Sequence, residues 1–446
     1  MYKNFLIFNR KFSRSRISNV ILLSFLSPII LLSNPLKSSF LLDSPKEIID
    51  QAWQIVYRDF LDPSGKFSKK DWIKVRKKLL SQKYFDSNEA HDAIRQMLLE
   101  LNDPYTKFLD PKQLNEMRID TSGELSGVGI QISINKESGD LIVVSPIEGS
   151  PAFEAGVQAK DKIISIDNIP TKGIGIEKAV QMIRGKKGTK VRLGILRGQE
   201  FKKITLIRNK IKIKSVYSKI NSHNNYGYKI GYIRLKTFNA QASREMKDTL
   251  IRFEDANVLG YVLDLRGNPG GLLESSIEIS RQWINKGVIV STLTKEGIKN
   301  SRKANGTAIT EKPLILLING GSASASEIVS GAIRDNKRGL LVGEKTFGKG
   351  LVQSMRTLSD GSGLTVTVAK YLTPSGIDIN KNGIKPDILA EARFGRKEKF
   401  SLSDFGTIKD NQYMVAENQL IKILQKDISI NKFDPKTKNI TFALSK

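Results

Sequence analysis

Residues 313–328 read PLILLINGGSASASEI, an apolar run that passes through a turn of small residues into a helical pattern. A short apolar run without polar alternation, bounded by glycines, predicts a buried strand. From about residue 231 to 345, apolar runs of this kind alternate with helical patterns. Strands are expected at IGYIRLKTF, GYVLDLRG, PLILLING and LLVGEK, and helices at REMKDTLIRFEDA, ESSIEISRQWI and ASEIVSGAIRD. Apolar strands that alternate with helices predict an α/β core.

The rest of the chain has other patterns. From about residue 44 to 116, apolar residues recur every three or four positions, which predicts a helical domain that closes on the NDPYT turn at 102–106. From 123 to 208, short β-branched runs punctuated by glycine, with one amphipathic helix, predict a small mixed domain. A last helix is expected at DNQYMVAENQLIKILQ. The fold class is therefore multidomain α/β and α+β, with domains at 1–38, 39–116, 117–208, 209–394 and 395–446.

The first 38 residues have the pattern of a targeting segment. Several lysines and arginines precede an apolar run from Val20 to Leu32, which is interrupted by Pro28. A basic region followed by an apolar run too short to span a bilayer predicts a secretory signal. No clean small-x-small cleavage site follows, so an uncleaved membrane anchor is the competing interpretation. Both interpretations predict an exported protein.

The composition excludes several kinds of chemistry. Since there is no cysteine, disulfides, thiol nucleophiles and Cys-based zinc sites are ruled out. The two histidines, His91 and His223, lie in a helical pattern and a polar loop, where surface or structural roles are expected. A Ser-His-Asp triad is therefore not indicated, no metal or other cofactor is expected, and a hydrolase here needs another base.

The chain is strongly basic, with 72 Lys and Arg against 45 Asp and Glu, a net charge of +27. The lysines are scattered through almost every segment rather than gathered into a stripe with interleaved aromatics. This distribution indicates general surface charge, and no nucleic-acid partner is expected.

Two strand-to-turn segments of the core carry candidate chemistry. The small-residue turn around Ser324 places its middle residue at a helix N-terminus, where free N–H groups can stabilise an oxyanion; the alternative is a serine-rich helix cap. In GEKTFGKGLVQ, residues 343–353, Lys349 stands between two glycines that allow close backbone packing. If Lys349 is buried, its pKa falls and the neutral amine can act as a base. The alternative is an anion-binding or turn element.

Two glycine-rich turns offer backbone amides. The turn of LDLRGNPGG, residues 263–271, can bring an amide against a substrate carbonyl, although a purely structural turn is the alternative. In Gly127-Val128-Gly129-Ile130, converging N–H groups can hold a terminal carboxylate while the adjacent strand edge pairs with the peptide. A simple β-turn is the alternative there.

Residues 123–208 resemble a PDZ domain. Its carboxylate-binding loop is similar to Gly127-Val128-Gly129-Ile130, its connecting helix and turn to residues 150–157, and its central strand to DKIISI at 161–166. Together with the core segments, this resembles the carboxyl-terminal processing peptidases, serine proteases with a Ser-Lys dyad and an inserted PDZ domain. The resemblance covers nearly the whole chain after the targeting segment, including NDPYT, YLTPSG at 371–376 and GIKPD at 383–387. It implies a core of crotonase-like or ClpP-like α/β type.

The resemblance also implies roles for individual residues. Ser324 would be the nucleophile, Lys349 the general base, and Gln353 the residue that orients the lysine. The further implied residues are Glu327 in the surrounding polar shell, the amides of Ala325 and Gly270 as oxyanion donors, with Gly270 chosen over Gly271, and Arg184 as a gating contact between the PDZ domain and the core. For Arg184 the alternative is a cation that satisfies the helix dipole.

The function implied is a serine endopeptidase that cleaves near the C-terminus of exported proteins, with the PDZ domain holding that end. The sequence looks similar to the cyanobacterial and chloroplast branch, which includes the enzyme that trims the photosystem II reaction-centre precursor, so periplasm or thylakoid lumen is expected. One alternative is a crotonase-like acyl-CoA enzyme, which would leave the PDZ-like pattern unexplained. The other is a non-catalytic PDZ-based binding or chaperone protein, which would leave Ser324 and Lys349 unexplained.

Overall fold

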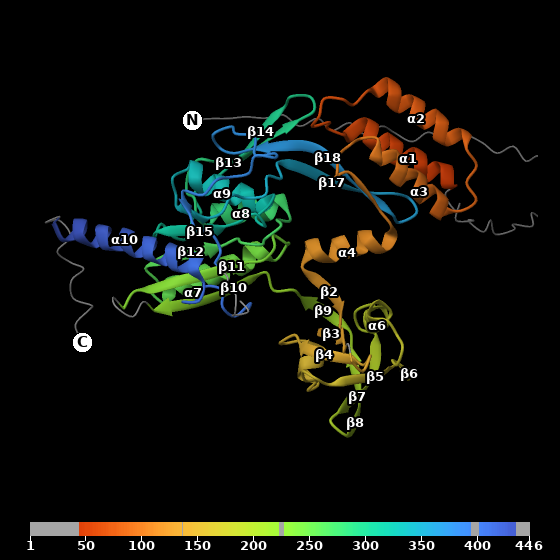
Figure 1. Cartoon of the computed structure of the whole chain (residues 1–446), viewed down its shortest axis with the longest axis horizontal. Coiled ribbons are helices and arrows are strands. Elements are labelled where there is room, and N and C mark those ends of the chain that lie inside the picture. The colour runs from red at the N-terminus through yellow and green to blue at the C-terminus, as the bar shows by residue number, and fades with distance from the viewer. Residues whose placement is uncertain (1–43, 136, 223–226, 394–400, 434–446) are drawn as a thin grey trace, which may run out of the picture. The chain divides into compact units, whose positions relative to one another are not determined.

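The computed structural model describes residues 44–135, 137–222, 227–393 and 401–433 (Figure 1). The expected signal or anchor at 1–38 and the loop histidine His223 lie outside these residues. None of the helices within the described ranges combines the length and hydropathy that crossing a membrane requires.

Three helices begin the described chain at the stretches that the sequence predicts. They are α1 (Pro45–Asp59), α2 (Lys69–Ser81) and α3 (Ser87–Leu99). Each begins at a capping side chain, respectively Ser44, Ser68 and Asp86, which accepts a free N–H of the first turn.

The apolar faces of these helices do not close a core by themselves. The cluster is completed by Leu358, Leu364 and Val366 of the hairpin formed by β17 (Leu351–Thr357) and β18 (Gly363–Leu372). Leu364 and Val366 lie on β18, and Leu358 lies in the turn between the two strands. His91 of α3 is also buried there, with its Nε2 2.7 Å from Oδ2 of Asp360 in the hairpin turn. The helical region is therefore packed directly on strands that come some 250 residues later, in agreement with a structural role for His91.

A short strand and a fourth helix follow, β1 (Lys107–Leu109) and α4 (Pro111–Ser122). The side chains of Asp110 and Gln113 form a reciprocal capping box that starts α4. The domain boundary expected at residues 116 and 117 therefore falls inside a helix. The sequence pattern missed this helix because only Leu114 of α4 is buried.

The small mixed domain has the expected strand order. Its sheet runs β3-β4-β5-β7-β8, with β6 beside β5. The elements are β3 (Ile130–Ile134), β4 (Leu141–Pro146), α5 (Pro151–Glu154), β5 (Lys162–Ile166), β6 (Ile169–Pro170), α6 (Ile176–Ile183), β7 (Lys190–Arg197) and β8 (Glu200–Ile207). Strand β3 is at the sheet edge beside α6, so one row of its backbone groups is open to an added strand. The domain is entered and left through a pair that the sequence did not indicate, β2 (Glu124–Gly127) with β9 (Asn209–Lys212).

The α/β core is built on a six-stranded sheet of order β10-β11-β12-β15-β16-β19. All neighbours are parallel except β10 and β11. The elements are β10 (Val216–Ser222), β11 (Lys229–Leu235), α7 (Ala242–Asp255), β12 (Gly260–Asp264), α8 (Leu273–Arg281), β15 (Leu314–Ile318), α9 (Ala325–Asp335), β16 (Leu340–Gly343), β19 (Ile388–Leu389) and α10 (Asn411–Phe433) (Figure 1).

Alternate residues of the central strands pack on opposite faces of this sheet. Leu314 and Leu316 join the cluster formed with α7, α8 and α9, whereas Ile315 and Leu317 join the cluster formed with α10. Burial on both faces explains why β15 reads as a continuous apolar run. The predicted alternation of strands and helices is confirmed.

A second sheet was not resolved by the sequence pattern. It pairs β1, β18, β13 (Val288–Thr294) and β14 (Lys299–Lys303), with β17 beside β18. Strand β18 thus pairs with β1 of the helical region and with β13 of the core. This sheet brings the NDPYT turn next to the segment that contains Lys349.

Candidate active site

Ser324 occupies the turn between β15 and α9 in a constrained backbone conformation. Its φ is 56° and its ψ is −113°, a combination that non-glycine residues rarely adopt and that costs about 1–3 kcal/mol. The neighbouring serines are fully buried: the Oγ of Ser322 donates to the Leu265 carbonyl and the Oγ of Ser326 to the Asn268 carbonyl, each at 2.8 Å. Ser324 is only half-buried and lines a cleft of about 560 Å³. The three serines therefore divide into two that hold the turn and one that faces the cleft.

Glu327 connects the Ser324 turn to the Lys349 segment. Its carboxylate is fully buried, and Oε2 accepts the backbone N–H of Ser324 at 2.9 Å and that of Lys349 at 2.8 Å. Oε1 accepts the N–H of Gly348 at 2.7 Å and the hydroxyl of Thr346 at 2.6 Å. One charged group thus satisfies four donors from two segments, and the two backbone positions of the expected dyad share a single oxygen.

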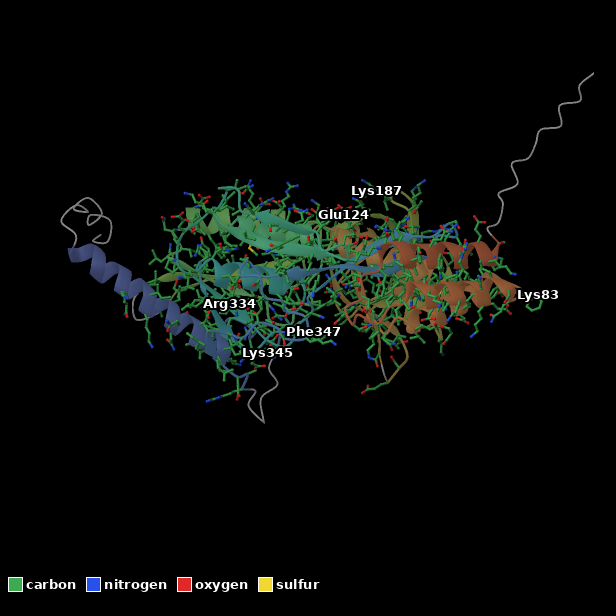
Figure 2. All side chains as sticks on the ribbon, turned by 90° about the horizontal axis from the view of Figure 1, so that it is seen from above. Lys83, Glu124, Lys187, Arg334, Lys345 and Phe347 are labelled. Carbon is green, nitrogen blue, oxygen red and sulfur yellow. The ribbon has the colours of Figure 1, made fainter. Side chains whose placement is uncertain are left out.

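Lys349 lines the same cleft on a backbone held by close packing. A Cβ at Gly348 would come within 3.0 Å of the Gly383 nitrogen, and one at Gly350 within 2.6 Å of the Asn380 nitrogen, so the two flanking glycines are required. Lys349 is half-buried, in contrast to Lys345 and Phe347 a few residues earlier, whose side chains lie exposed at the surface (Figure 2).

The environment of the Lys349 amine favours its neutral form. Burial lowers the pKa of Lys349 from its ordinary value and the positive charge of Lys107 lowers it further, while the negative charge of Asp103 acts in the opposite direction. The Nζ lies 4.7 Å from the centre of the Tyr105 ring. No hydrogen bond between this Nζ and the Ser324 side chain is found in the described part of the chain. In this conformation the amine therefore faces the ring, within the cleft that it shares with Ser324.

Tyr371 of β18 lies between the two segments. Its fully buried hydroxyl donates to the Lys349 carbonyl and interacts with the Ser324 side chain. Desolvation raises the pKa of Tyr371 well above its ordinary value, so the phenol stays protonated. It acts as a neutral donor that fixes the Lys349 backbone.

Gln353 lines the cleft, but no hydrogen bond between its side chain and Lys349 is found among the described residues. Its Nε2 donates to Oγ1 of Thr367 at 3.4 Å. That threonine hydroxyl in turn donates to Oδ2 of Asp103 at 2.6 Å. The hydrogen bond by which Gln353 was expected to orient Lys349 is therefore not formed in this conformation. The side-chain amide of Gln353 is linked through Thr367 to the NDPYT turn instead.

The two candidate amide donors of the GNPGG turn differ in their availability. The N–H of Gly270 is donated to Oδ1 of Asn268 at 2.9 Å, whereas no hydrogen bond of the Gly271 N–H is found among the described residues. Gly271 also lines the cleft. Gly270 packs closely on the turn that contains Ser324, since a Cβ at Gly270 would come within 2.9 Å of the Ser324 Cβ. The structure thus reverses the expected preference: Gly271 has the free amide, and the engaged Gly270 amide is a weaker candidate.

The amide of Ala325 is open toward the cleft. Ala325 is the first residue of α9 and lines the cleft, and its N–H makes no hydrogen bond to any residue that the structure describes. A free N–H at a helix N-terminus beside Ser324 is suited to a developing negative charge.

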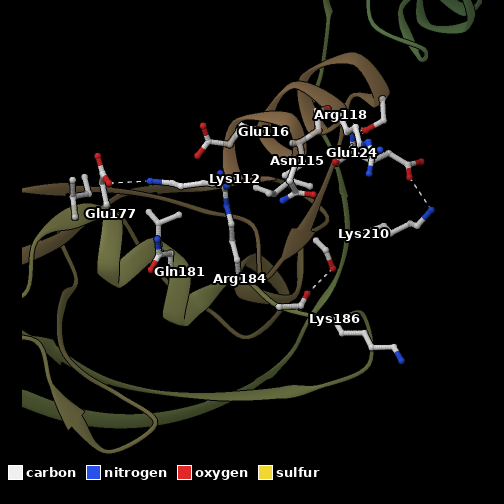
Figure 3. Close-up of a pocket in the computed structure, with 17 residues that line it drawn as sticks. Lys112, Asn115, Glu116, Arg118, Glu124, Glu177, Gln181, Arg184, Lys186 and Lys210 are labelled. Carbon is white, nitrogen blue, oxygen red and sulfur yellow. Dashed lines mark hydrogen bonds and ion pairs between the residues drawn. The ribbon is translucent and has the colours of Figure 1, made fainter. Parts of the chain in front are cut away.

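Ser126, the residue before the expected carboxylate-binding loop, lines a second pocket, whereas the loop residues 127–130 do not line it. This pocket, of about 1070 Å³, lies between α4, α6 and the β2–β9 pair (Figure 3). Gly129, within the loop, has a φ of 76°, and a Cβ there would collide with the Ser150 side chain at 2.2 Å, so only glycine fits. Apolar side chains on the pocket wall are Ile119, Leu125, Ile176 and Val180.

Arg184 ends α6 at the margin of this pocket. Its side chain extends toward α4, and its Cγ lies 3.9 Å from the position of a Cβ on Gly127 (Figure 3). No hydrogen bond or ion pair of the Arg184 side chain is found within the described ranges, whereas the Lys112 side chain on the same pocket is paired with Glu177 at 3.0 Å. The half-buried guanidinium is thus available beside the glycine-rich loop.

Several side chains of the site belong to sequence motifs, but the sequence analysis predicted no role for them. Asp103 and Tyr105 belong to NDPYT and Tyr371 to YLTPSG, segments that marked the resemblance without a role for any side chain. Thr367 had no signal at all. Among the described residues no cluster of His, Cys, Asp or Glu could hold a metal ion.

Comparisons with known proteins show which family this chain resembles. The family model described as "Peptidase family S41" matches residues 229–390, and the "PDZ domain" model matches residues 116–196. A carboxyl-terminal-processing protease of a Picosynechococcus species is 42% identical over 89% of this chain and 94% of its own length. The chloroplastic carboxyl-terminal-processing peptidase 2 of Arabidopsis thaliana is 38% identical over 86% of this chain and 76% of its own. A solved structure titled photosystem II D1 C-terminal processing protease is similar, with 36% identity, a TM-score of 0.51, and coverage of 78% of this chain and 93% of that one.

Proposed function

Because this chain belongs to the carboxyl-terminal-processing proteases of peptidase family S41, we propose that Ser324 and Lys349 form its catalytic dyad. The observation that carries the proposal is the buried carboxylate of Glu327, since a single oxygen accepts the backbone N–H of both residues. Such a clamp fixes the separation of the two backbones, which is what a nucleophile and its base require. The relatives are proteases, and they give no support to an acyl-CoA enzyme or a non-catalytic chaperone.

The proposed reaction is acyl transfer. The Oγ of Ser324 attacks the scissile carbonyl carbon while its proton passes to the neutral Nζ of Lys349, which turns from the Tyr105 ring toward the serine. The amides of Ala325 and Gly271 stabilise the oxyanion, and Gly270 can serve only after releasing Asn268. Lys349 then returns the proton to the leaving amine, and water hydrolyses the acyl-enzyme by the same route in reverse.

The dyad predicts a specific pH dependence. Lys349 can accept the serine proton only when it is unprotonated, and its pKa is lowered by burial. We therefore expect kcat/KM to rise with pH through this pKa and to level off below the pH at which an exposed lysine deprotonates, near 10.4. The measurement is kcat/KM from pH 5 to 10.5 in buffers of constant ionic strength, with and without a metal chelator. A rate that falls over the range where Lys349 deprotonates, or that a chelator abolishes and added metal restores, contradicts the dyad.

We further propose that the PDZ domain binds the C-terminus of the substrate. The open edge of β3 can pair with an extended peptide, and the loop at Gly127–Ile130 can receive its carboxylate. The adjacent pocket has Leu125, Ile176 and Val180 on its wall beside several charged side chains, so a substrate with an apolar end is used as the first probe.

Cleavage of a matched pair of substrates tests this binding mode. An unstructured protein with an apolar C-terminus is compared with the same protein carrying a C-terminal amide, and the products are mapped by mass spectrometry. We expect C-terminal shortening of both, with KM raised at least tenfold by the amide because the carboxylate contact is lost. Equal KM values would remove the carboxylate-reading role of the loop.

The gating role of Arg184 is a separate prediction. If its guanidinium stabilises an engaged position of the PDZ domain, Arg184→Ala lowers kcat several-fold with little change in KM. Lys186→Ala, an exposed cation of the same pocket, is the matched control. A rise in KM alone would assign Arg184 to carboxylate binding and would exclude gating.

We also propose that the enzyme acts after export, in the periplasm or the thylakoid lumen, on exported or lumenal proteins. The chloroplastic relatives support this location. The basic and apolar pattern of residues 1–38 supports export and leaves a membrane tether as an option for an uncleaved segment.

A further inference from the structure

We propose that Tyr105 is a positioning residue of the catalytic dyad, and that its ring holds the protonated Lys349 side chain in the cleft until the amine loses its proton. This inference rests on the proposed Ser324–Lys349 mechanism. The Tyr105 ring centre lies 4.7 Å from Nζ, within the range of a cation–π contact, and Ser324, Tyr105 and Lys349 line the same cleft. The helical N-terminal region thereby contributes directly to the active site.

Tyr105 is held rigidly enough to position another side chain. Its N–H donates to Oδ1 of the buried Asp103 at 3.2 Å, and its carbonyl accepts the hydroxyl of Thr365 at 2.9 Å. Oδ2 of Asp103 accepts the hydroxyls of Thr106 and Thr367, each at 2.6 Å. The turn that carries Tyr105 is thus fastened to β18, the strand that also carries Tyr371.

The Tyr105 ring is the group against which the Lys349 ammonium lies. The charged or titratable groups that face Lys349 come from the turn and β1, from α9 and from β18: Asp103, Tyr105, Lys107, Glu327 and Tyr371. Asp103 and Glu327 are engaged by other donors, and no hydrogen bond or ion pair of the Lys349 ammonium is found within the described ranges. A ring face attracts an ammonium electrostatically, whereas a neutral amine has no comparable attraction and can turn toward Ser324.

Tyr105 acts on the lysine in two ways that can be separated. As a bulky group it keeps water from the amine, which lowers the pKa of Lys349; as an aromatic face it stabilises the ammonium, which raises the same pKa. Leucine retains much of the bulk without the ring face, alanine removes both, and phenylalanine retains both.

The test is the pH dependence of kcat/KM for Tyr105→Phe, Tyr105→Leu and Tyr105→Ala in the full chain. We expect Tyr105→Phe to retain most of the wild-type kcat and its pH profile. In Tyr105→Leu the acid limb should move to lower pH by about half a unit. In Tyr105→Ala it should move to higher pH as water reaches the amine, and in both variants kcat at the plateau should fall about tenfold because the lysine is less well placed. Superimposable acid limbs for the four proteins would overturn the proposal.

Tyr57→Leu is the matched control for loss of an aromatic residue. Tyr57 lies in α1 of the same helical region, with Nζ of Lys69 5.3 Å from its ring centre. The Tyr57→Leu substitution should lower the melting temperature without moving the acid limb of the pH profile. If the role of Tyr105 is only structural, the Tyr105 variants should behave in the same way. If Ser324→Ala is inactive but the acid limb of the pH profile does not move in the Tyr105 variants, only the positioning role of Tyr105 is excluded. If Ser324→Ala keeps full activity, the proposed dyad itself is excluded.

Discussion

We expect Ser324→Ala and Lys349→Ala each to abolish proteolysis, with a loss of kcat of about a thousandfold or more, in a protein that remains folded. The nucleophile and its base act as one unit, so removal of either leaves only the binding contacts and the oxyanion amides. Initial rates of cleavage of an unstructured substrate, with circular dichroism to verify folding, provide the measurement.

Two neighbouring substitutions serve as controls. Ser330→Ala removes a serine of α9 whose hydroxyl donates to the Ser326 carbonyl one helical turn earlier, and Lys345→Ala removes an exposed lysine four residues before Lys349. Both should cleave at nearly the wild-type rate. Near-full activity in either dyad variant would contradict the assignment.

Glu327→Gln reduces both stability and kcat strongly. The carboxylate receives four donors in a site closed to solvent, and a glutamine would present an NH2 group to one pair of them. Buried donors left without an acceptor cost about 1–3 kcal/mol each. We expect a melting temperature lowered by several degrees and kcat lowered about a hundredfold, because the backbones of Ser324 and Lys349 are no longer held together.

Glu245→Gln separates the two effects. Glu245 likewise accepts two backbone N–H groups, those of Ser215 and Val216, but it does not line the cleft. This variant should lose stability and keep kcat at a temperature where it is folded. If Glu327→Gln behaves in the same way, Glu327 supports the fold and does not position the dyad.

The sequence predicted the parts of the fold that depend on local periodicity. The apolar run of residues 314–318 is a strand buried on both faces, and the glycine-punctuated runs of 123–208 form the expected mixed sheet with one main helix. The second sheet was missed as a unit because the pairs that assemble it, β1 with β18 and β13 with β18, join segments remote in sequence, such as Lys107 with Thr365. No periodicity within either segment specifies that pairing. Its other two pairs, β17 with β18 and β13 with β14, are local hairpins that the sequence analysis also did not predict.

The same distinction applies to the active site. Ser324 and Lys349 stand in unusual local contexts, a small-residue turn and a glycine-flanked lysine. Those contexts made both residues candidates but left a helix cap and an anion-binding turn as alternatives, and the roles themselves came from the family resemblance. The engagement of the Gly270 amide depends on Asn268, and the position of Gln353 depends on Thr367. The closeness of Tyr105 to Lys349 depends on how β18 joins the helical region to the core. These are properties of tertiary packing, so residue type and spacing alone could not give them.

Trapping the acyl-enzyme tests the central claim most directly. The full chain is mixed with an activated ester of a short apolar peptide, quenched in acid within the first turnover, and digested for tandem mass spectrometry. The Ser324–Lys349 assignment predicts an acyl group on Ser324, formed more slowly as the pH falls below the pKa of Lys349 and not formed by Lys349→Ala. An acyl group on another residue would contradict the assignment. So would hydrolysis of the ester without any acyl-enzyme, together with full activity of Ser324→Ala.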